Sequence, residues 1–181
     1  MAKAKTKLGR SREARTGGRT VEESQVEMVE VVLPNDANLL GNILGGKVMH
    51  LIDIAGAIAA HRHSRLQVVT ASVDSLDFLH PVRVGQIIVL RAFVTRAFHT
   101  SMEVEVNVYR DDYIEGKRRQ TSSAFLTYVA LDSEGKPAPV PPLAPRSAEQ
   151  RRRYREALER RRHRLALAAR AHRRYFDKGE C

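Results

Sequence analysis

Residues 46–61 carry the feature that most restricts how this chain can fold, because they form a helical pattern that is apolar on nearly every side. Within it, the apolar stretch 48–60 is interrupted only by His50 and Asp53. A helix without a polar face has to be buried. The stretch is too short to span a bilayer, so we expect no membrane span. The rest of the chain therefore has to surround this helix.

The segments predicted to surround this helix are β-strands. Residues 26–33 alternate and are β-branched, and four further runs follow the helix at 68–78, 84–96, 101–109 and 120–131. The run 101–109 has the clearest alternation, with Glu103, Glu105 and Asn107 on a face that we expect to meet solvent. Short connections favour antiparallel pairing. The predicted fold class is α+β, a long antiparallel sheet wrapped around one central helix, which is the hotdog fold.

Composition divides the chain into four parts. We expect a disordered basic tail at 1–20, a hotdog domain at 21–136, a proline-rich connector at 137–146 and a C-terminal Arg-rich helix at 147–176. Ser147 and Gln150 have the spacing of a capping box at the start of that helix. Its apolar stripe is thin, so we expect it to pack over a limited face.

The net charge of +10 belongs to the two ends of the chain. Residues 1–19 carry a net +6 and residues 146–181 a net +8, whereas residues 20–145 carry −4. The basic ends can attract polyanions such as nucleic acid, but only non-specifically. They do not define the main activity.

The sequence favours a reducing compartment. Cys181 is the only cysteine, so no disulfide can form within the chain and a cysteine-based zinc site is not expected. The basic N-terminus is not followed by the apolar region of a secretory signal. We therefore expect a cytoplasmic protein.

Asp53 is the residue most suggestive of chemistry. Its helical neighbours Met49, Gly56 and Ala57 are not polar, so the carboxylate is either buried and paired or lines a cleft. From position alone, a structural carboxylate and a general base or nucleophile both remain open.

The start of the same helix offers a second chemical feature. Gly45 and Gly46 lie at this start, and the unpaired N–H groups of a helix N-terminus can stabilise a developing oxyanion if glycine lets the ligand approach. A simple tight turn is the alternative. Asn42 fits either an orienting amide or an Asx turn.

Competing motifs are weaker. Residues 41–47 match the start of a phosphate-binding loop, but Val48 stands where Ser or Thr has to hold magnesium. His61 and His63 form an H-x-H pair without an acidic third ligand, so we expect no metal site. A G-x-S-x-G nucleophile elbow is absent from the sequence.

Motifs over about residues 24–140 together resemble the acyl-CoA hydrolase branch of the hotdog thioesterases. They begin with Asp36-Ala37-Asn38, Gly41-Asn42, Gly45-Gly46, Met49, Asp53 and Ala55-Gly56, continue through Arg62-His63, the segment 69–74, Phe78, Pro81-Val82 and Gly85, and end with segments 101–104, 123–125, 127–129 and 134–137.

This resemblance implies hydrolysis of an acyl-CoA thioester to a free fatty acid and coenzyme A (CoA). Asp53 then acts as general base or nucleophile, Asn42 faces it from a neighbouring subunit, and Gly45-Gly46 polarise the thioester carbonyl. No cofactor is implied, because CoA is part of the substrate.

The resemblance also implies a CoA groove and a homo-oligomer, with a dimer as the unit and a tetramer or hexamer as the assembly. The residues expected near the groove are Arg62, His63, Thr70, Ala71, Ser72, Ser101, Lys117 and Arg118.

Two other functions remain as alternatives. A non-catalytic hotdog protein that binds acyl-CoA would keep the groove but would not need Asp53. A nucleic-acid-associated protein would act through the basic ends. Acyl chain length depends on side-chain packing and is not predicted.

Overall fold

The computed structural model describes residues 18–112 and 116–176, with side chains as far as residue 170. Its strands are β1 (Val26–Val31), β2 (Gln67–Phe78), β3 (Ile87–Ala97), β4 (Ser101–Asp112) and β5 (Lys117–Leu131), and its helices are α1 (Gly45–Ser64) and α2 (Ala148–Phe176). Short 3-10 turns occupy Glu22–Ser24 and Pro34–Asp36. The predicted central helix and antiparallel sheet are confirmed. No helix in the described part of the chain is both long and apolar enough to cross a membrane.

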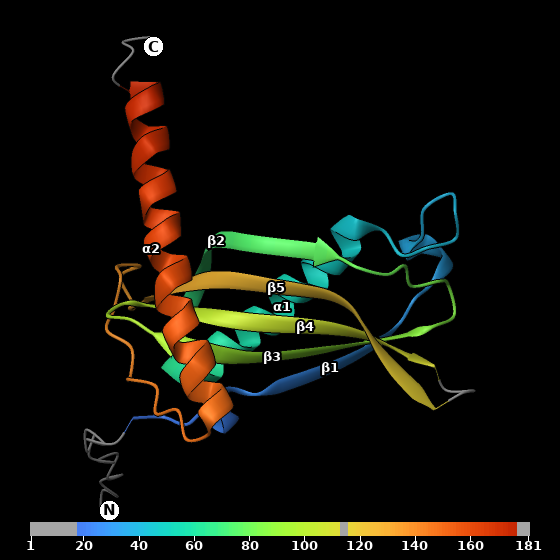
Figure 1. Ribbon diagram of the computed structural model, residues 1–181, viewed down its shortest axis with the longest axis horizontal. Helices are drawn as coiled ribbons and strands as arrows, with labels where there is room; N and C mark the ends of the chain where they lie inside the picture. The colour runs from blue at the N-terminus through green and yellow to red at the C-terminus, as the bar shows by residue number, and fades with distance from the viewer. Residues whose placement is uncertain (1–17, 113–115, 177–181) are drawn as a thin grey trace, which may run out of the picture.

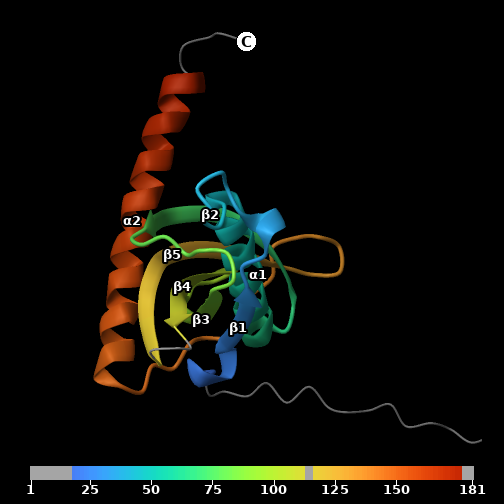
Figure 2. The same cartoon turned by 90° about the vertical axis from the view of Figure 1, so that its right-hand side faces the viewer.

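The five strands form one antiparallel sheet in the order β1-β3-β4-β5-β2. The sheet curves around α1, and α2 lies on its other face (Figures 1 and 2). β2 follows α1 directly in the chain but lies at the edge of the sheet, where it pairs only with β5. One side of β2 is therefore an open edge.

The core lies between α1 and the concave face of the sheet. Ile52, Ala55 and Ala59 of α1 are almost fully buried against inward-facing residues of β3 and β4 such as Leu90 and Val104. Fully buried alanines allow the helix backbone to approach the sheet closely. The opposite side of α1 is not covered in the single chain, since Met49 remains 48% exposed.

The convex face of the sheet is covered by α2, which corrects one expectation. Glu103 and Glu105 of β4 were expected to meet solvent, yet both are buried. Arg160 of α2 contacts Glu103 through two hydrogen bonds of 2.7 and 3.1 Å, and Arg153 lies 3.4 Å from Glu105. The carboxylates of this strand pair with a basic helix that is distant in sequence, so alternation of charge does not mean exposure here.

The predicted capping box at the start of α2 is confirmed. The N–H group of Gln150 donates to the Ser147 hydroxyl at 3.1 Å, and the side chain of Gln150 accepts from the N–H group of Ser147 at 3.3 Å. These reciprocal bonds satisfy N–H groups that a helix start leaves unpaired.

Candidate active site

Asp53 lies in the third turn of α1, half-buried, with its carboxylate turned toward β2 and β5. The Thr70 hydroxyl donates a hydrogen bond of 2.6 Å to its Oδ1 atom. The Tyr128 hydroxyl lies 3.3 Å from the same oxygen and 3.0 Å from the backbone carbonyl of Asp53. Among the described residues Asp53 forms no ion pair, and its partners are these two hydroxyl groups. Two hydroxyl donors leave further lone pairs of the carboxylate oxygens available to accept a hydrogen bond from a ligand or a water.

Tyr128 acts as a hydrogen-bond donor in this cluster. Burial raises the pKa of its hydroxyl, and the nearby Asp53 carboxylate raises this pKa further. The phenol therefore stays protonated across the physiological range. Tyr128 is fully buried, and sequence reasoning assigned it no role. The signal was weak, because 75 residues separate it from Asp53 along the chain.

A bulge in β2 places Thr70 on the side of Asp53. Thr70 pairs with Tyr128 and Ser72 pairs with Thr127, so Ala71 is an extra residue in β2. Without the bulge Thr70 and Ser72 would share a face. Instead Thr70 reaches Asp53, while Ser72 lies on the α2 side, where its hydroxyl is 3.4 Å from Asp74. Of the three residues predicted to line a CoA groove here, only Thr70 contacts the carboxylate.

The N-terminus of α1 is open to a ligand. Gly45 and Gly46 are exposed, and Leu44 at the N-cap position supplies no side-chain hydrogen bond. A Cβ atom at Gly46 would meet nothing within 4 Å. The N–H groups of this first turn carry partial positive charge, so a carbonyl oxygen can be stabilised here.

A cavity of about 300 Å³ adjoins this helix start and contains Asn38, Asn42 and Gly45 in its lining. The Oδ1 atom of Asn38 accepts hydrogen bonds from the N–H groups of Leu40 and Asn42, at 3.0 and 3.1 Å. Asn38 therefore makes the Asx turn that was one alternative for Asn42. The lining of this cavity does not include Asp53 of the same chain.

Arg62 and His63 lie at the other end of α1. The guanidinium of Arg62 donates to the backbone carbonyl of Gln25. His63 is fully buried, and its Nε2 atom lies 2.8 Å from the carbonyl oxygen of Pro141. Burial lowers the pKa of this imidazole. In the single chain the ring anchors the proline-rich connector, and the place of His63 near a CoA groove stays a prediction.

Ser101, Lys117 and Arg118 are not hydrogen-bond partners of the Asp53 carboxylate either. Ser101 precedes the core residue Met102, so its side chain points to the opposite face of the sheet from α1. Arg118 donates two hydrogen bonds, of 2.5 and 2.6 Å, to Asp111 across the β4–β5 hairpin. This pairing lowers the pKa of Asp111 and raises that of Arg118. Lys117 begins β5 beside Arg118 in the same hairpin. Within one chain these residues do not gather around Asp53.

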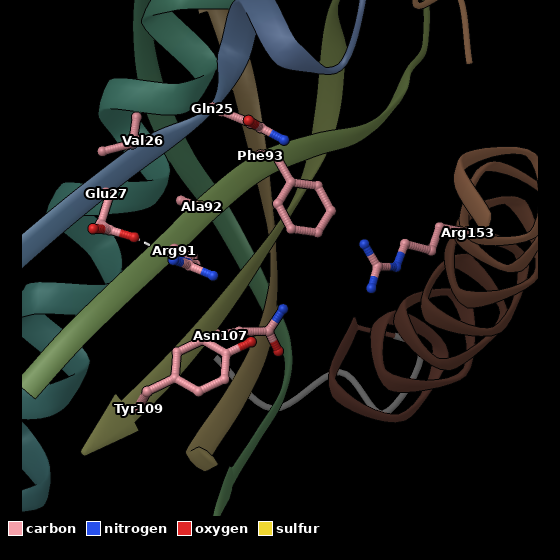
Figure 3. A pocket seen from close by; sticks show the side chains of 9 residues that line it. All are labelled: Gln25, Val26, Glu27, Arg91, Ala92, Phe93, Asn107, Tyr109 and Arg153. Carbon is pink, nitrogen blue, oxygen red and sulfur yellow. Dashed lines mark hydrogen bonds and ion pairs between the residues drawn. The ribbon is translucent and has the colours of Figure 1, made fainter. Parts of the chain in front are cut away.

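A cavity of about 540 Å³ lies on the convex face and is separate from Asp53 (Figure 3). Arg91 and Arg153 extend into it from β3 and α2, beside the rings of Phe93 and Tyr109. Arg91 donates a 2.6 Å hydrogen bond to Glu27, and Arg153 pairs with carboxylates. Both cations of this cavity are therefore already neutralised.

Comparison with known proteins places this geometry in context. A sequence model of the thioesterase superfamily matches residues 40–117. The acyl-CoA thioester hydrolase YkhA of Bacillus subtilis is 42% identical over 132 residues, which cover 73% of this chain and 77% of that protein. The cytosolic acyl coenzyme A thioester hydrolase of Rattus norvegicus is 40% identical over 76% of this chain, but the match spans only 36% of the rat protein.

Solved structures agree with these relatives. An acyl-CoA hydrolase from Staphylococcus aureus, in complex with butyryl coenzyme A and coenzyme A, superposes with a TM-score of 0.84 at 36% identity, covering 90% of this chain and 99% of the other. Variants of that enzyme with an aspartate, an asparagine or a threonine changed to alanine have also been solved. A hexameric acyl-CoA thioesterase has a TM-score of 0.81 at 44% identity, covering 83% of this chain and 97% of the other.

Proposed function

Because this chain belongs to the thioesterase superfamily, we propose that it is an enzyme that hydrolyses fatty acyl-CoA thioesters to a free fatty acid and CoA. The observation that carries the proposal is the arrangement at Asp53. A half-buried carboxylate on an apolar helix is held by two hydroxyl groups and has no cation partner among the described residues. A structural aspartate in such surroundings would be expected to pair with a cation.

The reaction needs a base and an oxyanion site. Asp53 takes a proton from water as the water oxygen attacks the thioester carbonyl carbon, or it attacks that carbon itself as a nucleophile. The carbonyl oxygen gains negative charge, and the N–H groups at Gly45 and Gly46 stabilise it. The carbon–sulfur bond then breaks, and the CoA thiolate leaves and takes up a proton. If Asp53 is the nucleophile, water then hydrolyses the acyl–Asp53 anhydride, which releases the fatty acid and restores the carboxylate.

Two copies of the chain complete the site in this proposal. Asp53 does not line the cavity at the N-terminus of its own α1. The open edge of β2 and the uncovered side of α1 both expose apolar side chains, including Val73 at 48% and Met49 at 48%. Apolar surface beside an unpaired strand favours edge-to-edge association. Such a dimer would bring Asp53 of one copy to the helix start of the other, and the hexameric relatives support further assembly.

An asparagine contributes from the neighbouring copy, and the residue pattern favours Asn38 over Asn42. In the Staphylococcus aureus enzyme the changed asparagine lies 15 positions before the changed aspartate, and the changed threonine lies 17 positions after it. Asn38 and Thr70 have these spacings from Asp53, whereas Asn42 lies 11 positions before it. The Nδ2 group of Asn38 also has no partner among the described residues, so it can donate to a water or a carbonyl.

A cytoplasmic location forms part of the proposal, because the rat relative is named as cytosolic. Nucleic-acid binding through the basic C-terminal segment receives no support from the contacts of α2. Arg153, Arg160 and Arg164 pair with carboxylates of the sheet instead of facing solvent.

A thiol-release assay over a panel of acyl-CoA chain lengths tests the function. The wild-type chain should release CoA, and Asp53→Asn should lower kcat by roughly 100-fold to 10,000-fold while the fold is retained, since a general base contributes about that much. Glu30→Gln removes an exposed carboxylate on β1 and serves as the control. Acyl-CoA binding without release of thiol would instead identify the non-catalytic binding protein.

A further inference from the structure

Helix α2 crosses the strands of the sheet one after another. The guanidinium of Arg96 in β3 lies 3.9 Å from the centre of the Tyr154 ring, and Arg160 lies 3.8 Å from the centre of the Phe125 ring in β5. Arg164 pairs with Asp74 of β2, the last strand of the sheet. From its N-terminus onward, α2 thus docks on β3 through Tyr154, on β4 and β5 through Arg160, and on β2 through Arg164.

The helix continues beyond the edge of its own sheet. Twelve residues of α2, 165–176, follow Arg164. At 1.5 Å per residue they span about 18 Å, which corresponds to more than three strand spacings of about 4.8 Å. Figure 1 shows this part of α2 projecting past β2. No strand of the described chain lies beneath its far end.

The composition of α2 changes where its own sheet ends. Residues 151–164 contain eight arginines, but residues 165–169 read Leu-Ala-Leu-Ala-Ala. Leu165 and Leu167 remain 52% and 49% exposed in the single chain. An apolar run on a projecting helix indicates contact with protein rather than with solvent.

A slot opens between this part of α2 and the edge strand. The cavity measures about 450 Å³, with residues 72–75 of β2 as its floor and His163, Arg164 and Leu167 among the α2 residues that roof it. The floor is the strand whose outer edge is unpaired. A strand added to that edge would run directly under the projecting half of α2.

We propose that this slot receives the edge strand β2 of a second copy. The α2 helix of each copy then crosses the junction between the two β2 strands and covers the sheet of the other copy. The inference rests on the edge-to-edge dimer of the proposed function and assigns α2 a role in it. In a two-fold dimer the contact is made twice, and each apolar run 165–169 packs on the partner. The arginines hold the helix on its own sheet, and the apolar run holds the neighbour.

Matched substitutions in adjacent residues test this role in the full-length chain. Leu167→Asp places a charge in the slot, whereas Ala166→Asp places the same charge on the neighbouring exposed residue, which does not line it. Leu167 is half exposed in one chain, so the fold of the protomer does not depend on it, and circular dichroism should be unchanged for both variants. Light scattering over a dilution series should show a dimer dissociation constant raised at least 10-fold by Leu167→Asp and less than 3-fold by Ala166→Asp.

Disulfide trapping identifies the occupant of the slot. With Cys181→Ser as background, one chain carries Leu167→Cys and a second, differently tagged chain carries Val73→Cys. Because each chain has a single thiol, any bond between the two tags joins two copies. Oxidation of the mixture should give the mixed disulfide dimer. A monomeric wild-type chain, absence of the mixed disulfide, or equal dissociation constants for the two aspartate variants would each overturn the proposal.

The same samples separate this inference from the proposed activity. Thiol release is measured at protein concentrations far above the dissociation constant, where Leu167→Asp should retain turnover. A wild-type dimer that shows the slot contact but releases no thiol would refute the thioesterase function and leave the role of α2 standing. Thiol release by the wild-type chain, together with no mixed disulfide from the cysteine variants, would instead refute the role of α2 and leave the thioesterase function standing.

Discussion

Gly56 of α1 lies directly beneath the hydroxyl group of Tyr128, and the two residues fit only because Gly56 has no side chain. A Cβ atom at this position would lie 3.0 Å from two ring carbons of Tyr128 and closer still to its hydroxyl oxygen. The missing side chain lets the phenol reach both the carbonyl and the carboxylate of Asp53.

Gly56→Ala should therefore destabilise the protein by about 1–3 kcal/mol, as overpacking does in a dense core. The intrinsic preference of a helix for alanine over glycine has the opposite sign, at about 1 kcal/mol. Urea denaturation measures the balance. The double variant with Tyr128→Phe should recover part of the loss, because the closest atom is removed. Net stabilisation by Gly56→Ala would contradict the contact.

Thr70→Val should lower kcat by roughly 10-fold with little change in stability, since it deletes the exposed hydrogen bond that orients the Asp53 carboxylate; the figure corresponds to a typical net hydrogen-bond energy of about 1.4 kcal/mol. Thr70→Ser retains the hydroxyl and should stay within about 3-fold of wild type. Thiol release under saturating substrate distinguishes the two variants. Equal kcat for valine and serine would mean that Thr70 does not position Asp53.

Asn38→Asp separates the role of the turn from the role of the amide. Aspartate keeps an acceptor for the N–H groups of Leu40 and Asn42 but removes the Nδ2 donor. We expect kcat to fall about 100-fold, the effect of losing one donor at a reacting oxygen. Asn42→Ala should cost less than about 5-fold. The opposite ranking would return the catalytic amide to Asn42.

Arg160→Leu should cost about 3 kcal/mol of unfolding free energy, because it leaves the buried Glu103 carboxylate without its cation. Arg152→Leu is the matched control. Arg152 pairs with Glu149 and Glu156 on the exposed face of α2, where solvent screens the ion pairs, so their loss should change the unfolding free energy little. Denaturant midpoints compare the two. Similar losses would show that Glu103 does not depend on α2.

Acid should weaken the fold through His63. Burial lowers the pKa of this imidazole in the folded state below its ordinary value of 6.5, so the unfolded chain binds the proton more readily. The stability that the neutral ring contributes is complete above about pH 6.5 and is lost as the pH falls below it, by at most about 1.4 kcal/mol per pH unit. Unfolding free energy measured from pH 7.5 to 5.5 should show this slope in the wild type and a smaller one in His63→Gln. The exposed His50→Gln should keep the wild-type slope.

Periodicity predicted the sheet and the central helix because each pattern is local. The alternation in residues 101–109 correctly divides β4 into two faces, but it does not say what covers the second one. Glu103 facing solvent and Glu103 facing Arg160 have the same sequence pattern. The covering helix lies more than 40 residues downstream, so only the folded chain reveals that both faces are buried.

The candidate site also depends on contacts between distant segments, which local sequence patterns do not show. Asp53 stands out locally because its helical neighbours are apolar. Its partners Thr70 and Tyr128 are ordinary strand residues, and only the pairing of β2 with β5 brings them to one point. From its position alone Asn42 fitted either an orienting amide or an Asx turn, and the side-chain bonds of that turn come from Asn38. The burial of His63 depends on a connector 78 residues away.

Ala71, the first of two extra residues in β2, has a consequence for any change in the length of that strand. It lets one strand serve two unrelated partners, with Thr70 turned toward the carboxylate of α1 and Asp74 turned toward Arg164 of α2. Deleting Ala71 would remove the first of the two register shifts of β2, which lie between Thr70 and Ser72 and between Val73 and Ser75. The residues on one side of the deletion would then face the opposite side of the sheet. A single-residue deletion would thus break either the hydrogen bond from Thr70 to Asp53 or the ion pair between Asp74 and Arg164. No substitution at one position could restore both contacts.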